Sequence, residues 1–181
     1  NKKEITLKGK LKAEIATINS VSIGQIKEMY VTNGDFVDKG EKIAEIETLL
    51  GRVGDNIVGV EQTNTEESFI SSVYSTSKGE VTNISLNKGD TVTLYAKILD
   101  IIVVDSDYIE ASIPFNWTID FDFTQPKTAE WINPLDKSPH NAELIYLYPF
   151  LTDGEIKALF KIDPVPNGLF FEQPVDVKLR I

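Results

Sequence analysis

One stretch of this chain occurs twice, at a spacing of 55 residues. Residues 23–46 form the first copy and residues 79–101 the second. The spacing carries Gly24 onto Gly79, Gly34-Asp35 onto Gly89-Asp90, Ile26 onto Val81, Met29 onto Ile84, Val31 onto Leu86, Val37 onto Val92, Ile43 onto Ile98, Ala44 onto Leu99 and Ile46 onto Ile101. Internal repetition constrains the fold strongly, because both copies are expected to form the same unit.

Each copy consists of a short apolar strand, a Gly-Asp turn and a second apolar strand. Asn33-Gly34 is a strong turn signal, because a tight turn needs a positive φ that glycine adopts without steric cost. A single hairpin is at best marginally stable in water. The repeat therefore predicts two small sheets that face each other and bury their Ile and Val side chains between them.

Composition excludes several classes of protein. The chain has 181 residues, 41% hydrophobic and 25% charged, which suits one ordinary or two small globular domains. A net charge of −10 argues against binding to nucleic acid or anionic lipid. Without cysteine the chain has no disulfide, thiolate zinc site or thiol nucleophile. No apolar run is long enough to span a bilayer, and no secretory signal pattern stands at the start.

The remaining segments favour strands. Apolar and polar residues alternate with a period of two over residues 4–15, and the lysines among them fit the solvent-exposed face of an edge strand. Residues 47–76 form a long connection with short strands expected near 56–60 and 68–74.

The C-terminal part of the chain alternates as well. Residues 108–123 have the same period of two, and Pro114 predicts a bend or an edge position there. Further strands are expected at 129–132, 142–148, 155–163 and 173–181. No segment has a convincing helical period, so the sequence predicts an all-β chain with at most one short helix.

The run from Gly24 to Gly40 resembles one half of a lipoyl/biotinyl-type domain, whose pattern is G-x-[IV]-x-x-[IM]-x-V-x-x-G-D-x-V-x-x-G. The second copy matches up to Val92 and then departs, with Tyr95 at the position of Gly40. This resemblance implies a split barrel-sandwich hybrid. The residues expected to shape its turns are Gly24, Gly34, Asp35, Gly40, Gly79, Gly89 and Asp90.

The order of parts resembles the periplasmic adaptor proteins, or membrane fusion proteins, in the broad HlyD-like sense. The runs 142–149 and 176–181 look like the closing strands of the adaptor β-barrel. The resemblance implies an N-terminal strand at 1–15 that joins the barrel, a lipoyl-like domain at 16–104 with an insertion at 48–72, and an antiparallel β-barrel at 105–181. Many adaptors carry a long helical hairpin at the insertion, but here this segment is short and broken by glycines. The chain also stops at Ile181, before the membrane-proximal domain of many adaptors.

The resemblance implies a non-enzymatic subunit that assembles as a homo-oligomer. It would bridge an inner-membrane transporter of RND or ABC type and an outer-membrane channel. It would lie in the periplasm or another extracytoplasmic space, anchored through a segment outside this sequence. Neither a cofactor nor nucleic acid is expected. Within the insertion, the apolar residues Leu49, Leu50, Val53 and Ile57 are either a partner contact or a cap on the open end of the domain.

Three kinds of chemical site would each depend on a single residue type in this chain. A lipoyl or biotinyl carrier needs a lysine between the two halves, and none occurs between Lys42 and Lys78. A zinc peptidase or a catalytic triad would depend on His140, the only histidine, which we expect in a solvated polar loop. A soft-metal site would depend on Met29, which the repeat places in the core.

Two further alternatives concern carboxylates and aromatic residues. A calcium site could involve Asp105, Asp107 and Glu110, or Asp120 and Asp122, but neither set has the spacing of a calcium loop, so solvated carboxylates are expected. The runner-up function is a small-molecule or glycan-binding β-module of a surface protein. Its exposed aromatic candidates are Trp131, Tyr146 and Tyr148.

Overall fold

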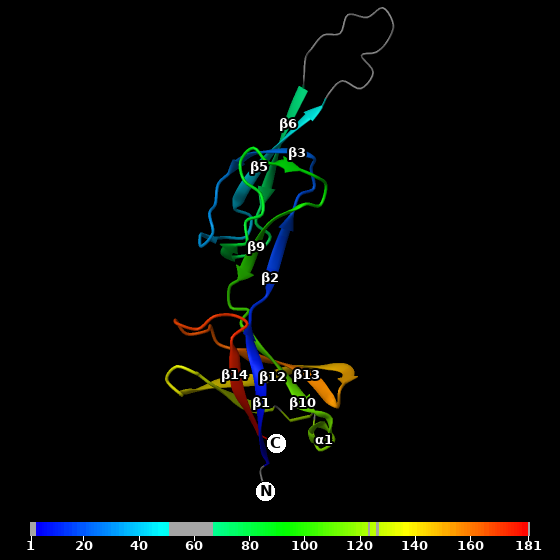
Figure 1. The fold of residues 1–181 in the computed structure, drawn as a ribbon, viewed down its shortest axis with the longest axis vertical. Helices are drawn as coiled ribbons and strands as arrows, with labels where there is room; N and C mark the ends of the chain where they lie inside the picture. The colour runs from blue at the N-terminus through cyan, green and yellow to red at the C-terminus, as the bar shows by residue number, and fades with distance from the viewer. Residues whose placement is uncertain (1–2, 51–66, 123, 126, 181) are drawn as a thin grey trace, which may run out of the picture. The chain divides into compact units, whose positions relative to one another are not determined.

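The computed structural model describes residues 3–50, 67–122, 124–125 and 127–180 (Figure 1). The chain forms two compact units. One unit comprises Asn1–Glu14 and Asp105–Ile181, and the other comprises Ile15–Val104. We refer to them as the barrel unit and the sandwich unit. The second is inserted into the first, between its first and second strands.

The sandwich unit consists of two four-stranded sheets. One sheet has the order β2 (Ile15–Asn19), β9 (Lys97–Val103), β7 (Gly79–Thr82) and β4 (Phe36–Val37). The other has the order β6 (Glu67–Tyr74), β5 (Lys42–Leu50), β3 (Gly24–Met29) and β8 (Thr91–Val92). The spacing of the repeat carries β3 onto β7, β4 onto β8 and β5 onto β9. The two sheets are therefore equivalent, as the repeat predicts.

A single core lies in the sandwich unit. Val31 is buried and Leu86 packs against the same cluster, so the two copies share one interior. Met29 and Ile84 also pack against it, partly buried. The buried members are Ile18, Ile26, Val31, Val37, Ile43, Ala44, Ile46, Val81, Val92, Ile98, Leu99 and Ile101.

The barrel unit is a closed antiparallel barrel. Its strands follow the order β1 (Glu4–Lys12), β10 (Tyr108–Pro114), β13 (Glu155–Ile162), β12 (Pro139–Thr152), β11 (Thr128–Ile132) and β14 (Pro174–Arg180), and β14 pairs with β1 to close it. The predicted fold class, an all-β chain with a barrel-sandwich and a β-barrel, is confirmed.

Strand β1 corrects one expectation. It pairs with β14 through Leu7↔Val177 and with β10 through Leu11↔Ile109, so it is not an edge strand. Its lysines are on the outer face of the barrel because the apolar residues between them point inward. The strand ends at Lys12 and β2 begins at Ile15, so the alternation over 4–15 covers two elements.

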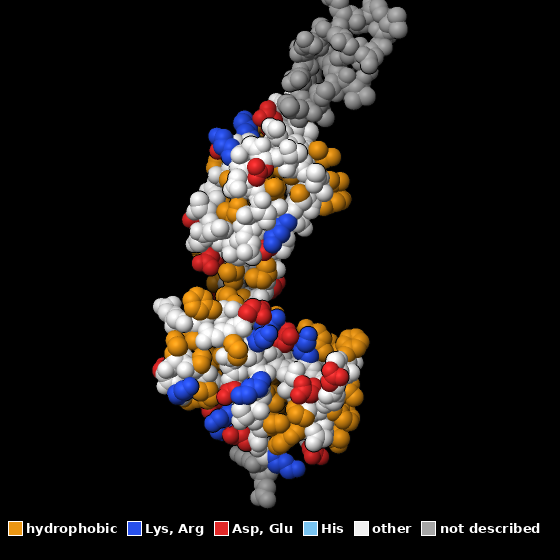
Figure 2. Space-filling model, viewed as in Figure 1, with side chains coloured by type: hydrophobic (Ala, Val, Ile, Leu, Met, Phe, Trp, Pro, Cys, Tyr) orange, Lys and Arg blue, Asp and Glu red, His pale blue; other side chains and the backbone are white. Residues whose placement is uncertain are grey.

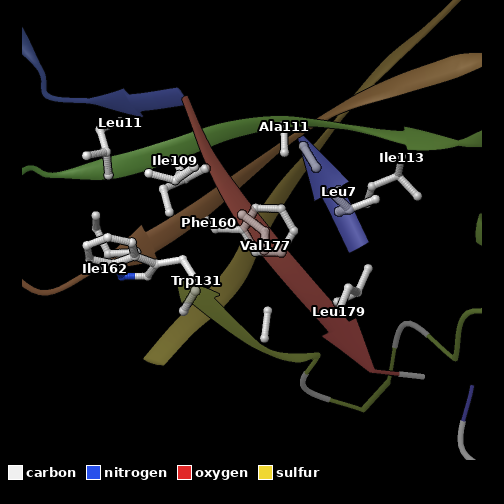
Figure 3. Close-up of a cluster of buried hydrophobic side chains, with 14 of the residues drawn as sticks. Leu7, Leu11, Ile109, Ala111, Ile113, Trp131, Phe160, Ile162, Val177 and Leu179 are labelled. Carbon is white, nitrogen blue, oxygen red and sulfur yellow. The ribbon is translucent and has the colours of Figure 1, made fainter. Parts of the chain in front are cut away.

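Side chains from all six strands fill the barrel (Figure 3). Trp131 is 1% exposed and lies among them, which corrects its assignment as an exposed aromatic residue. The buried members are Leu7, Leu11, Ile109, Ala111, Ile113, Phe121, Ala129, Trp131, Ala142, Ala158, Phe160, Ile162, Val175, Val177 and Leu179.

The predicted strand over 108–123 is wrong in its second half. β10 ends at Pro114, which has no N–H to continue the ladder, and α1 (Phe115–Thr118) follows. The Phe115 N–H donates to the Gly154 carbonyl at 2.9 Å, and the Thr118 hydroxyl donates to the Phe115 carbonyl at 2.7 Å. The alternation of apolar residues continues past Pro114, but the backbone does not stay extended.

Strand β12 also differs from expectation, because it continues through Pro149 to Thr152. Its register against β13 shifts between Leu147 and Leu151, which accommodates the proline in a bulge. Of the two strands expected in the long connection, 68–74 lies within β6, and 56–60 lies outside the described residues. Within the described ranges, no helix has the length and apolar character needed to cross a membrane.

Candidate functional site

The corner of the first copy is held by the second copy. The Gly34 N–H donates to the Val81 carbonyl at 2.8 Å, and the Val81 N–H donates to the Asp35 carbonyl at 2.8 Å. The following residues, Phe36 and Val37, form β4 and pair with β7. The first copy therefore supplies an edge strand to the sheet that contains the second.

The corner of the second copy has the reciprocal arrangement. The Gly89 N–H donates to the Ile26 carbonyl at 2.8 Å, and the Ile26 N–H donates to the Asp90 carbonyl at 2.9 Å. Strand β8 then pairs with β3, with Val92 opposite Gly24. Four hydrogen bonds thus join the two halves, two at each corner. The repeat relates the two bonds at one corner to the two at the other.

The Gly-Asp pair has a physical role in each corner. Gly34 has a φ of +95° and Gly89 a φ of +91°, which an L side chain rarely adopts. The Asp35 carboxylate accepts from the Thr32 N–H at 2.9 Å, and the Asp90 carboxylate accepts from the Asn87 N–H at 2.8 Å. Glycine permits the turn and aspartate closes it.

Gly24 and Gly79 are required for a different reason. They open β3 and β7, where the backbones of β5 and β9 approach closely. A Cβ on Gly24 would overlap the Glu47 carbonyl oxygen, and a Cβ on Gly79 would overlap the Ile102 carbonyl oxygen. No larger residue fits either position without moving a backbone.

The departure from the pattern at Tyr95 leaves the turn intact. Gly40 has a φ of +86° and Tyr95 a φ of +64°. The Gly40 N–H donates to the Ser75 carbonyl at 2.7 Å, and the Tyr95 N–H donates to the Ser20 carbonyl at 2.8 Å. Tyr95 therefore keeps the left-handed turn that glycine would adopt without strain.

Ser20 and Ser75 were missed by the sequence reasoning. Both are fully or nearly fully buried. The Ser20 hydroxyl donates to the Ser22 carbonyl and the Ser75 hydroxyl donates to the Ser77 carbonyl, each at 2.6 Å. The signal was present, since Ser-x-Ser-x-Gly precedes both copies at the repeat spacing. The repeat thus extends further toward the N-terminus than its apolar positions indicate.

A repeated ion pair was also missed. The Asp100 carboxylate is buried and accepts from the Lys97 ammonium at 2.7 Å, the Thr17 hydroxyl at 2.7 Å and the Asn83 amide at 3.0 Å. Burial alone would raise the pKa of Asp100, but these three hydrogen bonds, that of Lys97 foremost, hold it below its ordinary value.

The repeat spacing carries Lys97 and Asp100 back onto Lys42 and Glu45, which pair at 2.8 Å. Glu45 also accepts from the Tyr30 hydroxyl at 2.8 Å. The hydrogen bonds from Lys42 and then Tyr30 lower the pKa of Glu45. The two lysines are about equally exposed, so the pairs differ in the carboxylate, which is more deeply buried in the second copy.

The proposed partner-contact residues are only partly covered by the structure. Leu49 and Leu50 lie in β5, opposite Ser68 and Glu67 of β6. Val53 and Ile57 lie outside the described residues.

Beyond Glu47, which is opposite Gln25 of β3, β5 continues with β6 alone, as a two-stranded ribbon (Figure 1). On this ribbon Phe69 is 55% exposed and Ile70 is 44% exposed. The ribbon therefore presents apolar surface at one end of the sandwich unit.

His140 lies in strand β12 and not in a solvated loop, which corrects the sequence expectation. Its ring stacks on Trp131 with centroids 4.8 Å apart, and its Nε2 lies 2.9 Å from the Ser138 hydroxyl. The ring is half-buried and its role is consistent with packing.

The other aromatic candidates are on the outer part of β12. Tyr146 is exposed and Tyr148 is half-buried, with ring centroids 5.1 Å apart in an edge-to-face arrangement. The Lys157 ammonium lies 5.5 Å from the centre of the Tyr148 ring. An open cavity of about 350 Å³ adjoins them, lined by Ser112, Tyr148, Phe150, Thr152, Asp153, Glu155 and Lys157.

The carboxylates considered for calcium have other partners. Glu110 lies 3.8 Å from the Lys12 ammonium and 3.4 Å from that of Lys157. Asp107 accepts from the Val165 N–H at 2.8 Å, while burial and the nearby Asp105 raise its pKa. In the part of the chain that the structure describes, no group of three or more acidic, histidine or cysteine side chains is placed to hold a metal ion.

Comparisons by sequence give no relative, since no family model matches the chain and no curated protein does. Comparisons by structure find several solved proteins with a similar fold. MacA from Actinobacillus actinomycetemcomitans superimposes with a TM-score of 0.72 at 12% identity, over 100% of this chain and 79% of that one. The membrane fusion protein Spr0693 from Streptococcus pneumoniae R6 superimposes with a TM-score of 0.64 at 10% identity, over 97% of this chain and 98% of that one.

The chain has the fold of a membrane fusion protein.

A third structure, the periplasmic adaptor protein EmrA, agrees, with a TM-score of 0.54 at 9% identity over 95% of this chain and 96% of that one. These matches confirm the resemblance that the repeat and the order of parts indicated. They extend over both the sandwich unit and the barrel unit, so the membrane fusion protein fold accounts for nearly the whole chain.

Proposed function

We propose that this protein is a non-enzymatic adaptor subunit of an efflux or secretion system. The observation that carries the proposal is the match of both units, in this order and topology, to membrane fusion and periplasmic adaptor proteins over 95% or more of the chain. An adaptor acts through surfaces and not through a catalytic centre. Consistent with this, Glu110 is paired with lysines and His140 is stacked on Trp131.

In this proposal the subunit works outside the cytoplasmic membrane and is anchored through a segment that this sequence does not contain. Several copies assemble side by side through residues 16–104. The barrel, residues 105–181 with the strand at 1–15, lies toward an inner-membrane transporter of RND or ABC type. The insertion at 48–72, with Leu49, Leu50, Val53 and Ile57, lies toward an outer component such as a channel. Interfaces of modest size would suffice for such a transient assembly.

The surface charge supports a protein partner over nucleic acid. The chain has a net charge of −10, and Figure 2 shows acidic and basic side chains interspersed on the visible face of the barrel unit. Binding to phosphate backbones needs a concentration of lysine and arginine. An interspersed surface of this kind does not provide it.

The insertion allows a sharp test, because Leu50 and Glu67 are already opposite each other in the β5–β6 ladder. Replacing residues 51–66 by Asn-Gly would close β5 and β6 with a two-residue turn and leave the described sandwich intact. In cells that lack the natural gene, the natural protein should restore resistance to the exported compounds. The variant should fold and yet fail to restore it.

Circular dichroism and thermal melting of this variant are the control, because they show whether it is folded. A folded variant with full export would contradict the proposed role of the insertion. Failure of the natural gene to affect the accumulation of any compound in a broad panel would contradict the adaptor function itself.

A second candidate function is binding of a small molecule or glycan. The observation in its favour is the cavity of about 350 Å³ beside Tyr148 and Phe150. Aromatic faces next to carboxylates and hydroxyls are suited to sugars. Calorimetric titration of a glycan panel against the wild type and Tyr148→Ala tests it, and binding that is lost in the variant would favour it over the adaptor.

A carrier function is a third and weaker alternative. The chain has no lysine between Lys42 and Lys78, the region where a carrier would be acylated. Incubation with lipoyl or biotin ligase should therefore leave the intact mass unchanged. An acylated lysine found by mass spectrometry would restore the carrier hypothesis.

A further inference from the structure

The dipeptide Asn-Gly occurs twice in the sequence, as Asn33-Gly34 in the sandwich unit and as Asn167-Gly168 in the barrel unit. Both lie in turns with a similar backbone, since Gly34 has a φ of +95° and Gly168 a φ of +93°. All four residues are exposed. The chain therefore offers the same dipeptide, in similar turns, in two different surroundings.

An Asn-Gly dipeptide loses its side-chain amide without an enzyme when the turn leaves both groups accessible. The asparagine side chain lies close to the backbone N–H that follows it, and glycine has no Cβ to hinder their approach. The glycine nitrogen gives its proton to solvent and attacks Cγ, so that an N–Cγ bond forms and the Cγ–Nδ2 bond breaks. Ammonia leaves with a proton taken from solvent, and a five-membered succinimide remains. One water molecule then opens this ring to aspartate or isoaspartate.

The fold protects Asn33-Gly34 at both reacting groups. The Gly34 N–H donates to the Val81 carbonyl at 2.8 Å, which fixes the nitrogen that would attack. The Asn33 side-chain oxygen accepts from the Ile84 N–H at 3.3 Å, which ties the side chain to the second copy of the repeat. The reaction therefore needs the corner to open, and the bond from Gly34 is one of the four that join the two copies.

The fold gives Asn167-Gly168 no such protection. Neither the Asn167 side chain nor the Gly168 N–H has a hydrogen-bond partner among the residues that the structure describes. The attacking nitrogen and the amide under attack are both exposed to water, which must accept the first proton and later open the ring. The turn is therefore open to the reaction without any unfolding.

The second turn lies between two anchors on the barrel. The Val165 N–H donates to the Asp107 carboxylate at 2.8 Å, and the Glu172 N–H donates to the Leu11 carbonyl at 2.6 Å. Between them, within the described part of the chain, the backbone of residues 166–171 makes no hydrogen bond to a barrel strand. The turn can therefore change its backbone geometry while both anchors hold.

We propose that Asn167 is a site of spontaneous deamidation in the folded protein, and that the corner contacts protect Asn33 from the same reaction. The product carries one negative charge in addition to the net −10 of the chain, and isoaspartate also lengthens the backbone by one methylene. Phe170, which is 77% exposed, lies three residues on in the same segment. The modification therefore alters charge and backbone beside an exposed apolar side chain. It does not depend on the adaptor function.

A time course of the full chain in mildly alkaline buffer tests the proposal. Cleavage after lysine gives the peptides 28–39 and 162–178, which contain Asn33 and Asn167 as their single asparagines. Mass spectrometry follows the change from amide to carboxylate in each peptide, and a sample taken at the start corrects for conversion during digestion. Asn167 should convert about tenfold faster than Asn33 or more, because Asn33 reacts only while its corner is open.

Two controls separate the fold from the dipeptide. In the chain unfolded by urea, Asn33 and Asn167 should convert at similar rates, because both are followed by glycine and neither keeps its folded contacts. Asn167→Gln replaces one exposed amide by another whose longer side chain would have to close a six-membered ring. This variant should melt as the wild type does, and its peptide 162–178 should keep its mass.

Three results would overturn the proposal. The first is an Asn167 that stays intact in the folded chain while it converts in urea. The second is an Asn33 that converts as fast as Asn167 in the folded chain. The third is a mass change in peptide 162–178 that persists in Asn167→Gln, since it would place the reaction at another amide.

Discussion

The Gly34 N–H donates to the carbonyl of Val81 at 2.8 Å, across a sequence separation of 47 residues within the sandwich unit. The reciprocal bond, from Gly89 to Ile26, has the same length of 2.8 Å. Because each corner supplies a strand to the sheet of the other copy, neither copy can complete a sheet by itself. The stability of the sandwich unit should therefore respond sharply to changes at the contacts between the copies.

The two kinds of glycine in the repeat should differ in their response to alanine. Gly79→Ala should destabilise the chain by about 2–3 kcal/mol, because the new Cβ would overlap the Ile102 carbonyl oxygen. Gly34→Ala should cost only about 1 kcal/mol, since nothing lies within 4 Å of its Cβ and the loss comes from a φ of +95°. Gly34→Val should cost at least as much as Gly34→Ala. Urea unfolding monitored by circular dichroism measures the free energy of unfolding of each variant. An equal loss of stability in Gly79→Ala and Gly34→Ala would contradict the close approach of β7 and β9.

Tyr95→Gly should stabilise the protein. Tyr95 holds a φ of +64° and its side chain is largely exposed, so glycine removes strain and loses little contact. The gain should be about 0.5–1 kcal/mol, after subtraction of the extra entropy of glycine in the unfolded chain. The midpoint of urea unfolding should rise. Gly40→Tyr, the reverse change at the equivalent turn, is the matched control and should lower it.

Asp100→Asn should destabilise the sandwich unit by about 1–3 kcal/mol, because the buried carboxylate accepts from Lys97, Asn83 and Thr17. Glu45→Gln, at the equivalent position of the first copy, is the matched control and should cost less, since the Glu45 carboxylate is less deeply buried than that of Asp100 and water screens it more. Urea melts at pH 7 give both values. An equal loss for the two variants would contradict the buried character of the Asp100 pair.

The Asp100 effect should also depend on pH in one direction. Its pKa lies below the ordinary value of 3.8 in the folded chain, so the unfolded chain binds the proton more tightly. The stabilisation by the charged carboxylate is complete above the pKa that Asp100 has in the unfolded chain. It is lost as the pH falls through the lower pKa that Asp100 has in the folded chain. The difference between wild type and Asp100→Asn should therefore shrink in melts below about pH 4. A difference that stays constant down to pH 2 would show that the carboxylate charge does not matter.

Asp107 should show the opposite behaviour. Burial and Asp105 raise its pKa, so the charged form is disfavoured in the folded chain at neutral pH. Asp107→Asn keeps an oxygen that can accept from the Val165 N–H and removes the charge, so stability at pH 7 should be unchanged or higher. Asp107→Ala loses the acceptor and should cost about 1 kcal/mol. Thermal melts of both variants distinguish the two effects, and a large loss in Asp107→Asn would mean that the charge itself is needed.

The sequence predicted the shared core of the two copies because that signal is local and periodic. Ile26 and Val81 occupy equivalent apolar positions beside equivalent glycines, so a spacing count sufficed. The exchange of corner strands was not predictable in the same way. The bond from Gly34 to Val81 depends on which sheet a two-residue strand joins, and no residue pattern specifies this.

The errors in the barrel unit have a similar cause. Apolar alternation continues from Phe115 to Phe121, but Pro114 ends the ladder and the next residues form a helical turn. Trp131 and His140 looked like separate surface features because their positions in the sequence give no sign that β11 pairs with β12. Only that pairing brings the two rings to a stacked distance of 4.8 Å.

The exchange of corner strands determines when each part of the chain can fold during synthesis. The first copy and the whole of β5 have been made when residue 50 leaves the ribosome, yet their sheet still lacks β6 and β8. Strand β1, made first, must wait for β14, which is made last, before the barrel closes. Nascent chains of this protein will therefore expose apolar strands for most of translation, and they should depend on chaperones more than a chain whose neighbouring strands are also neighbours in sequence.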